Sequence, residues 1–331
     1  FFSPQMADTL CVSSGTAAIK VALKALGIGR GDQVITQAFN FIATVEAIVD
    51  TGAKVIFSDI DDTLNMSAKS LEKLITKKTK AIIPVHMLGV PADMISINRI
   101  GKRNKIPVIE DACEAIGAKV ASKYVGGLSE FGVFSFDFGK MITTGEGGAL
   151  FTKRKSDGKN ARMYHDHGHK NIPNLPRGLD RAGLIGFNYR MTEISGAFGK
   201  VQLEKFPRIL RESKKRYRSL EKYIKHNEII FRSVNKGNEP NYDTFVISIA
   251  NKKLRNRVIS LLHKTGFGTK NLPDAFNWHC AYFWEHFDKN IRNKEVTSCY
   301  NRLINCIAIP ILVSRPIIDY KNIASYINEC S

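Results

Sequence analysis

The strongest candidate for a reactive side chain is a lysine that follows an apolar run. Lys140 lies in SFDFGKMITTGEGGALFT, residues 135–152, between strand-like residues and a glycine-rich turn. A lysine on a solvated surface needs no apolar neighbours. A desolvated ammonium has a lowered pKa, and the free amine that results is a nucleophile. We therefore predict that Lys140 binds a cofactor covalently; the alternative is an amphipathic surface lysine.

Two other stretches contain groups that bind the charged parts of a small molecule. IPVIEDACEAIGA, residues 106–118, has the pattern of a buried strand ending at Asp111. A carboxylate there is costly unless it meets a cation or donors, so Asp111 would hold a protonated ring nitrogen or cap the next helix. CVSSGTAAIKVALKALG, residues 11–27, opens a helix with small residues. Such a helix end binds phosphate or is an ordinary N-cap.

The combination is more informative than its parts. The turn at residues 11–27 lacks the glycine spacing of a Walker loop or a dinucleotide fingerprint. A phosphate-binding turn, an acid at a strand end and a lysine after a later strand are instead the groups that bind pyridoxal 5'-phosphate. The sequence therefore predicts this cofactor.

These stretches must be positioned by the elements around them. β-Branched runs predict strands in DQVITQ, AKVIFSDI, KAIIPVH, IPVIED, FGVFSF and GALFT, and helical periods occupy residues 15–27, 41–51, 67–76 and 93–104. This alternation is typical of an α/β fold whose largely parallel sheet has helices on both faces. A long basic helix follows, expected over about residues 192–226 with an interruption at Pro207. We predict a large cofactor-binding domain over residues 1–205 and a small C-terminal α+β domain over residues 206–331.

Composition and charge limit the possible partners. Apolar residues make up 44% of the 331 residues, and no apolar run reaches the roughly 18 residues of a membrane span, so no membrane partner is expected. Six scattered cysteines are typical of the reducing cytoplasm. The net charge of +18 is concentrated in residues 205–232, which form either a nucleic-acid-binding stripe or a solvated helix face. No nucleic-acid-binding motif accompanies the charge, so we favour the solvated face and expect no nucleic acid.

Six motifs in a fixed order resemble a known family. They are SSGTAAI, NFIATVEAI, PVHMLGVPADM, VIEDACEAIGA, SFDFGKMITTGEGGALFT and GFNYRMTEISGAFGKVQLEK, and they cover about residues 11–226. Together they resemble the DegT/DnrJ/EryC1/StrS family of pyridoxal-phosphate-dependent sugar aminotransferases. The resemblance implies the type I fold of the aspartate aminotransferase superfamily, with a mixed, mostly parallel sheet. It also implies a cytoplasmic homodimer that moves an amino group from an amino acid, by analogy glutamate, to a keto-sugar in lipopolysaccharide or other glycoconjugate biosynthesis.

The resemblance also implies roles for residues around the cofactor ring. Lys140 would bind the cofactor covalently and move a proton between the cofactor and the substrate. Asp111 would keep the ring nitrogen protonated. Phe41 would stack on the ring, or it is ordinary core packing. Glu114 stands where the family often has Gln, near the phenolic oxygen, and a carboxylate there disfavours the phenolate.

Further implied contacts involve the cofactor's phosphate. Gly15, Thr16 and Ser135 match the family's phosphate-binding residues. Asn188, in GFNYR, matches a residue that reaches the phosphate from the neighbouring subunit. The resemblance therefore implies an active site shared within a homodimer.

Two histidine-containing stretches are candidates for substrate contacts. MYHDHGHKN, residues 163–171, is either a metal site or a loop at the edge of the active site; the i, i+2 spacing beside Gly and Pro favours the loop, and no metal is expected. NWHCAYFWEHF, residues 277–287, is a substrate wall or a core patch. We predict substrate contacts for His165, His167 and His279. Both stretches also resemble the branch of the family that aminates a keto-octulosonate sugar acid, such as an 8-oxo-octulosonate, and an anionic substrate suits a basic protein.

Two other functions stay open. A sugar 3-dehydratase of the same fold has a histidine in place of the lysine, so Lys140 argues against it. A non-catalytic regulator would keep the fold and bind nucleic acid through its basic surface; the presence of Lys140, Asp111 and Ser135 disfavours it.

The start of the sequence, FFSPQMADTL, has neither an initiator Met nor a signal-peptide pattern. We therefore expect it to continue a longer chain. Members of the family usually have some tens of residues before the phosphate-binding turn, and these contribute to substrate binding and dimer contacts.

Overall fold

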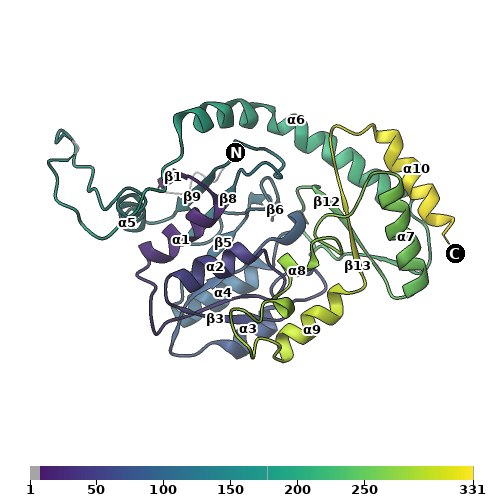
Figure 1. Cartoon of the computed structure of the whole chain (residues 1–331), viewed down its shortest axis with the longest axis horizontal. Coiled ribbons are helices and arrows are strands. Elements are labelled where there is room, and N and C mark those ends of the chain that lie inside the picture. The colour runs from purple at the N-terminus through teal and green to yellow at the C-terminus, as the bar shows by residue number, and fades with distance from the viewer. Residues whose placement is uncertain (1–7, 177, 331) are drawn as a thin grey trace.

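A computed structural model describes residues 8–176 and 178–330 (Figure 1). Its larger part contains a four-stranded sheet in the order β1-β9-β8-β5 and a three-stranded sheet in the order β3-β2-β4. Bridges between Ile82 and Val108 and between Val85 and Asp111 join the two, so one sheet runs β1-β9-β8-β5-β4-β2-β3. The strands are β1 (Asp8–Val12), β2 (Gln33–Gln37), β3 (Lys54–Ser58), β4 (Thr79–Ile83), β5 (Ile109–Asp111), β8 (Phe131–Ser135) and β9 (Gly148–Thr152).

Most neighbours in this sheet are parallel. Strand β2 pairs in parallel with β3 and β4, and β5 pairs in parallel with β8. Strand β9 is antiparallel to both β8 and β1. The predicted mixed, mostly parallel α/β fold is confirmed, and the edge strand β1 is an addition that the sequence did not predict.

Helices cover both faces of the sheet because alternate strand residues point to opposite sides. Val34, Ile83 and Leu150 belong to a core shared with α1 (Gly15–Ala25), α2 (Ile42–Asp50) and α5 (Lys155–His165). Their neighbours Ile35 and Ile82 belong to the core on the other face, shared with α3 (Ala68–Leu74) and α4 (Met94–Asn104). The four helices predicted between residues 15 and 104 lie within one to two residues of their expected starts and ends.

Helix α6 (Glu193–Tyr223) connects the two parts of the molecule and runs along one edge in Figure 1. It continues through Pro207, so the predicted interruption is wrong. Phe206 is buried against the large sheet, whereas Tyr217 and Leu220 lie in the core of the smaller part. These contacts on both sides of the proline hold the helix although one backbone hydrogen bond is missing. The predicted boundary between residues 205 and 206 falls inside α6 and stays a prediction.

The smaller part is a three-stranded antiparallel sheet covered by helices. The sheet contains β10 (Ile229–Phe231), β12 (Thr244–Ile249) and β13 (Cys306–Pro310), and α7 (Lys252–Lys264) and α10 (Ile317–Asn328) pack on it. A core that includes Trp284 and Phe39 joins this part to the large sheet. The remaining elements are η1 (Met87–Gly89), α8 (Phe276–His279), η2 (Ala281–Phe283), α9 (Lys294–Leu303), and the short strands β6 (Lys119–Val120), β7 (Lys123–Tyr124) and β11 (Asn238–Glu239). Within the described ranges, no helix is long and apolar enough to cross a bilayer.

Candidate functional site

One pocket of about 230 Å³ lies at the carboxyl ends of β5 and β8, beside the first turn of α1. The carboxyl ends of the strands are where such sheets bind ligands. Seven of the residues singled out from the sequence line it: Gly15, Thr16, Phe41, Asp111, Glu114, Ser135 and Lys140. They come from four separate stretches of the chain. The fold therefore brings the groups predicted to bind one cofactor into one cavity.

The N-terminus of α1 forms one end of the pocket. Ser14 is the N-cap, and its side chain accepts a hydrogen bond from Ala17 N at 3.1 Å. The first N–H groups of a helix have no partner within the helix, and they attract anions. A Cβ on Gly15 would lie 2.9 Å from Ser135 Cβ, so only glycine lets α1 approach β8 this closely. The turn is therefore an N-cap, and it stays the predicted anion-binding site.

Asp111 ends β5 and is almost completely buried. Its Oδ2 accepts a hydrogen bond from Thr44 Oγ1 at 2.7 Å, and its Oδ1 accepts one from Cys113 N at 3.1 Å. No helix follows directly, so Asp111 is not the cap of a helix. Both oxygens of the side chain thus have a donor, and these donors fix its orientation in the pocket.

Lys140 lies in the loop between β8 and β9, and its side chain is 18% exposed. Its Nζ is 3.9 Å from Glu114 Oε1. Burial lowers the pKa of Lys140, but the nearby negative charges, Glu114 first among them, raise the pKa above its usual value. The lowered pKa expected from the sequence is therefore wrong for the chain without a cofactor, because the sequence did not reveal that an ionised carboxylate faces the amine.

Phe41 lines the pocket, and the predicted substrate residue His279 packs against it without lining the pocket itself. Phe41 precedes α2 and is 43% exposed, so it is not an ordinary core residue. Its ring centroid is 5.2 Å from that of His279, which lies at the end of α8. His279 Nδ1 lies 2.8 Å from Ala275 O, and burial lowers the pKa of the imidazole. His279 is thus a buried side chain behind Phe41.

Asn188, His165 and His167 do not line this pocket. Asn188 is exposed, and its backbone forms an isolated antiparallel β-bridge with the backbone of Asp166. His165 is the last residue of α5, not part of a loop, and its Nδ1 lies 2.6 Å from Arg162 O. Any contact of these three residues with a cofactor or substrate therefore has to involve another copy of the chain or a ligand that extends from the pocket.

Some residues of the pocket were not predicted from the sequence. Thr44 lies one helical turn after Phe41 and binds Asp111, a spacing that could have identified it. Asn271 comes from the smaller part and donates to Glu114 Oε1 at 3.2 Å. No local pattern marks it. Asn40 also lines the pocket, and its Oδ1 is buried without a partner among the described residues.

The donor set fits pyridoxal phosphate. An anion-binding helix end beside Ser135, a buried carboxylate with ordered donors, an aromatic ring and a lysine amine line the same cavity. The crowded contact at Gly15 and the unpartnered oxygen of Asn40 show that the cavity wall is shaped for a polar occupant. Each charged part of this cofactor therefore has a group of complementary charge or hydrogen-bonding character.

Comparison with known proteins supports the same conclusion. A GDP-perosamine synthase of Escherichia coli O157:H7 is 43% identical over 202 residues, which are 58% of this chain and 52% of that protein. A pleiotropic regulatory protein of Geobacillus stearothermophilus is 40% identical over 214 residues, which are 64% of this chain and 55% of that protein. The matched region thus spans about half the length of these relatives.

The match to the family and to the fold extends further along the chain. The structure of an aminotransferase from Psychrobacter cryohalolentis superposes with a TM-score of 0.87 at 25% identity, and the match covers 98% of this chain and 87% of that one. The model of the DegT/DnrJ/EryC1/StrS aminotransferase family matches residues 5–315. The chain therefore belongs to the DegT/DnrJ/EryC1/StrS aminotransferase family, and pyridoxal phosphate is its cofactor.

Proposed function

We propose that this protein is a sugar aminotransferase that moves an amino group from an amino acid to a keto-sugar. The observation that carries the proposal is the placement of Lys140 in one pocket with Asp111 and the N-terminus of α1. Pyridoxal phosphate, when bound, supplies an aldehyde and an electron-accepting ring that stabilises negative charge on a substrate carbon.

The residues of the chain then have separate tasks. Lys140 Nζ would hold the cofactor and would move a proton to and from the substrate. Asp111 would accept a hydrogen bond from the cofactor's ring nitrogen, and Thr44 Oγ1 donates the hydrogen bond that holds Asp111 in place. Gly15, Thr16 and Ser135 would hold the phosphate, and Phe41 would lie against the ring.

The proposed amino donor is glutamate, and the proposed acceptor is a keto-sugar that is either nucleotide-linked or a sugar acid such as an 8-oxo-octulosonate. The perosamine synthase relative supports the nucleotide-linked class. The net charge of +18 supports an anionic acceptor of either class. The products would enter surface polysaccharide biosynthesis in the cytoplasm.

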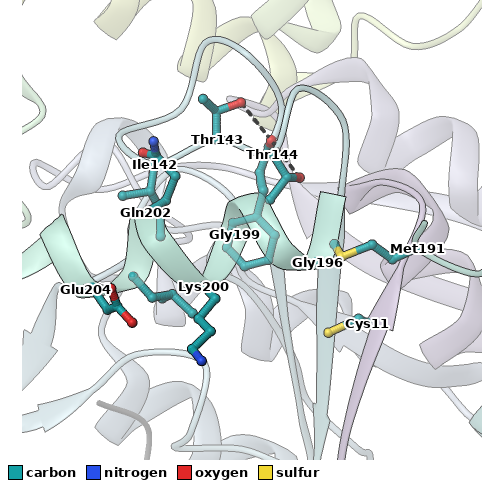
Figure 2. A pocket seen from close by; sticks show the side chains of 12 residues that line it. Cys11, Ile142, Thr143, Thr144, Met191, Gly196, Gly199, Lys200, Gln202 and Glu204 are labelled. Carbon is teal, nitrogen blue, oxygen red and sulfur yellow. Dashed lines mark hydrogen bonds between the residues drawn. The ribbon is translucent and has the colours of Figure 1, made fainter. Parts of the chain in front are cut away.

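We also propose a homodimer in which Asn188 reaches the partner's cofactor. Exposed apolar side chains lie close together in sequence on both sides of the start of α6: Ile185 and Ile194 are each 84% exposed, and Phe198 is 51% exposed. Figure 2 shows an adjoining apolar pocket of about 450 Å³ between α6 and the turn that follows Lys140, lined by Ile142, Met191 and others. Covering this face with a second copy would remove apolar surface from water and support the Lys140 loop.

The decisive experiment offers glutamate and a panel of keto-sugars to the purified holoprotein. The panel contains GDP- and UDP-linked keto-hexoses and an 8-oxo-octulosonate, and mass spectrometry detects replacement of a carbonyl by an amine. We expect one sugar class to be aminated, with 2-oxoglutarate formed in equal amount, and no reaction with Lys140→Ala. Loss of water from the sugar without a gain of nitrogen would instead indicate the dehydratase.

A regulatory function is the second candidate, because one relative is named a pleiotropic regulatory protein. In that case the basic face of α6 would bind nucleic acid. Several of its cations are already paired within the chain, including Lys214 with Glu239 and Arg218 with Glu221. Salt-dependent DNA binding in the absence of amine transfer would favour this function over ours.

A further inference from the structure

Glu114 is held in a fixed position facing Lys140. Its Oε2 accepts a hydrogen bond from Leu88 N at 2.8 Å, and its Oε1 accepts one from Asn271 Nδ2 at 3.2 Å. Its backbone carbonyl accepts a third from Asn241 Nδ2 at 2.9 Å. These donors come from the η1 turn and from the smaller part of the molecule, so two separate parts of the fold hold Glu114. The carboxylate cannot turn away from Lys140 Nζ, 3.9 Å distant, without losing its hydrogen bonds to Leu88 and Asn271.

Other charged and titratable groups around the amine are less direct partners. Asp137 lies on the same loop, Cys113 precedes Glu114, and Asp243 lies before β12, where it forms an ion pair with Lys270. Lys270 and His279 also face Glu114, and with Lys140 they lower the pKa of Glu114 to about 2 although burial opposes this. Glu114 is therefore fully ionised at neutral pH. Among the described residues, its charge contributes most to keeping Lys140 protonated.

We propose that Glu114 is a positioning residue that holds Lys140 as an ammonium in the cofactor-free chain and so limits how readily the amine captures an aldehyde. The inference rests on the proposed role of Lys140. Capture requires the ammonium first to release a proton to solvent. The nitrogen lone pair then attacks the aldehyde carbon, a carbon–nitrogen double bond forms, and the aldehyde oxygen leaves as water with the two amine hydrogens.

Replacing Glu114 by glutamine removes the negative charge of the side chain but keeps its shape. Its oxygen can still accept from Leu88 N, and the side chain has the same length. Without the negative charge, burial becomes the dominant influence and lowers the pKa of Lys140. A glutamine variant should therefore take up an aldehyde at lower pH than the natural chain does.

The test measures the rate at which the cofactor-free full-length chain takes up pyridoxal phosphate, and separately pyridoxal, which has no phosphate. Absorbance follows the rate between pH 6 and pH 10, with Lys140→Ala subtracted as background, and the pH midpoint of each chain is taken as the pH at which its rate equals that of the natural chain at pH 9. We expect Glu114→Gln to lower the pH midpoint by at least about one unit, which makes uptake about tenfold faster at pH 7. The matched control is Glu146→Gln, because Glu146 lines the same pocket but is exposed, and its shift should be much smaller.

Each outcome decides a separate question. A midpoint for Glu114→Gln that equals the natural one, or equals that of Glu146→Gln, overturns the inference. If Glu114→Gln does not fold, Glu114→Asp replaces it: the charge is retained but lies one methylene further from Lys140, so its midpoint should also fall. Borohydride reduction and peptide mapping of the natural chain test the proposed function itself, because an adduct on a lysine other than Lys140 contradicts that proposal whatever the midpoints are.

Discussion

The role proposed for Lys140 depends on its own nitrogen, so its substitution gives the sharpest residue-level prediction. Lys140→Ala should lower turnover by on the order of a thousandfold or more. Pyridoxal phosphate should still bind through Ser135 and the α1 N-terminus, but without a covalent bond. The measurement combines turnover with borohydride mapping. Lys153→Ala is the control, since Lys153 donates to Leu128 O outside the pocket and its loss should leave the adduct in place. A borohydride-stable adduct in Lys140→Ala would refute the assignment.

Thr44 tests whether Asp111 needs its buried donor. Thr44→Val keeps the shape of the side chain but removes the 2.7 Å hydrogen bond to Asp111 Oδ2. A hydrogen bond to a charged group contributes roughly 1.5–3 kcal/mol, so we expect pyridoxal phosphate affinity to fall about tenfold or more. Equilibrium dialysis measures this, and Thr44→Ser, which keeps the hydroxyl, should bind nearly as well as the natural chain. Equal affinity in both variants would show that the bond does not position Asp111.

At this scale, residue type and chemical logic singled out Lys140 and Asp111, which line one pocket, but not their neighbours. Both were singled out because a lysine or carboxylate in an apolar run is costly without a partner, and their roles stay predictions. Asn271 was not singled out, since an amide in a loop is unremarkable until the fold brings it to a partner, and Thr44 was missed although it lies one helical turn after Phe41. The direction of the pKa shift of Lys140 was wrong for the same reason: it depends on Glu114, which is 26 positions away in the chain.

At the scale of elements, the approach of α1 to β8 makes a prediction. A Cβ on Gly15 would lie 2.9 Å from Ser135 Cβ and 3.0 Å from Cys113 Sγ, so Gly15→Ala must move α1 away from the end of β8. We expect affinity for pyridoxal phosphate to fall at least tenfold, with a smaller loss for phosphate-free pyridoxal. Gly29→Ala is the matched control, because a Cβ there meets nothing closer than Thr51 O at 3.8 Å. Equal losses for both ligands would show that the phosphate is not held at this helix end.

The elements themselves were largely predictable, and the exceptions have physical causes. Six predicted strands correspond to β2, β3, β4, β5, β8 and β9, because buried strands are marked by short β-branched runs. Edge strand β1 was not predicted, because its alternating pattern is short and half exposed. The interruption at Pro207 was wrong because tertiary packing on both sides outweighs the lost hydrogen bond. His165 was predicted to lie in a loop, but it is the last residue of α5.

At the scale of the whole molecule, the two parts of the chain meet at the pocket. Arg232, beside β10, donates to Thr63 O at 2.7 Å and to Met87 O at 2.8 Å. Asn271 and Asn241 bind Glu114 from the same side. The smaller part therefore positions the loop and the carboxylate that face Lys140. No local sequence pattern predicts these contacts, because they join segments that are more than a hundred residues apart in the chain.

The proposed homodimer predicts that a second copy of the chain completes the pocket, and mixing two inactive variants tests this. If Asn188 serves the partner's cofactor, a heterodimer of Lys140→Ala and Asn188→Ala chains has one pocket with both residues intact. An equal mixture, assembled statistically, should regain about a quarter of the natural activity, since half of the dimers are mixed and each has one intact site. Each variant alone should be nearly inactive. If Asn188 acts within its own chain, the mixture regains nothing.

The reciprocal heterodimer makes the test decisive. A chain with both substitutions, paired with a natural chain, leaves no pocket intact when Asn188 acts across the interface, because the natural Lys140 then meets the substituted Asn188. The same heterodimer keeps one intact pocket when Asn188 acts within its own chain. Chains with different affinity tags allow this species to be purified. We expect it to be nearly inactive, and half of the natural activity would place Asn188 in the pocket of its own subunit or remove it from the site.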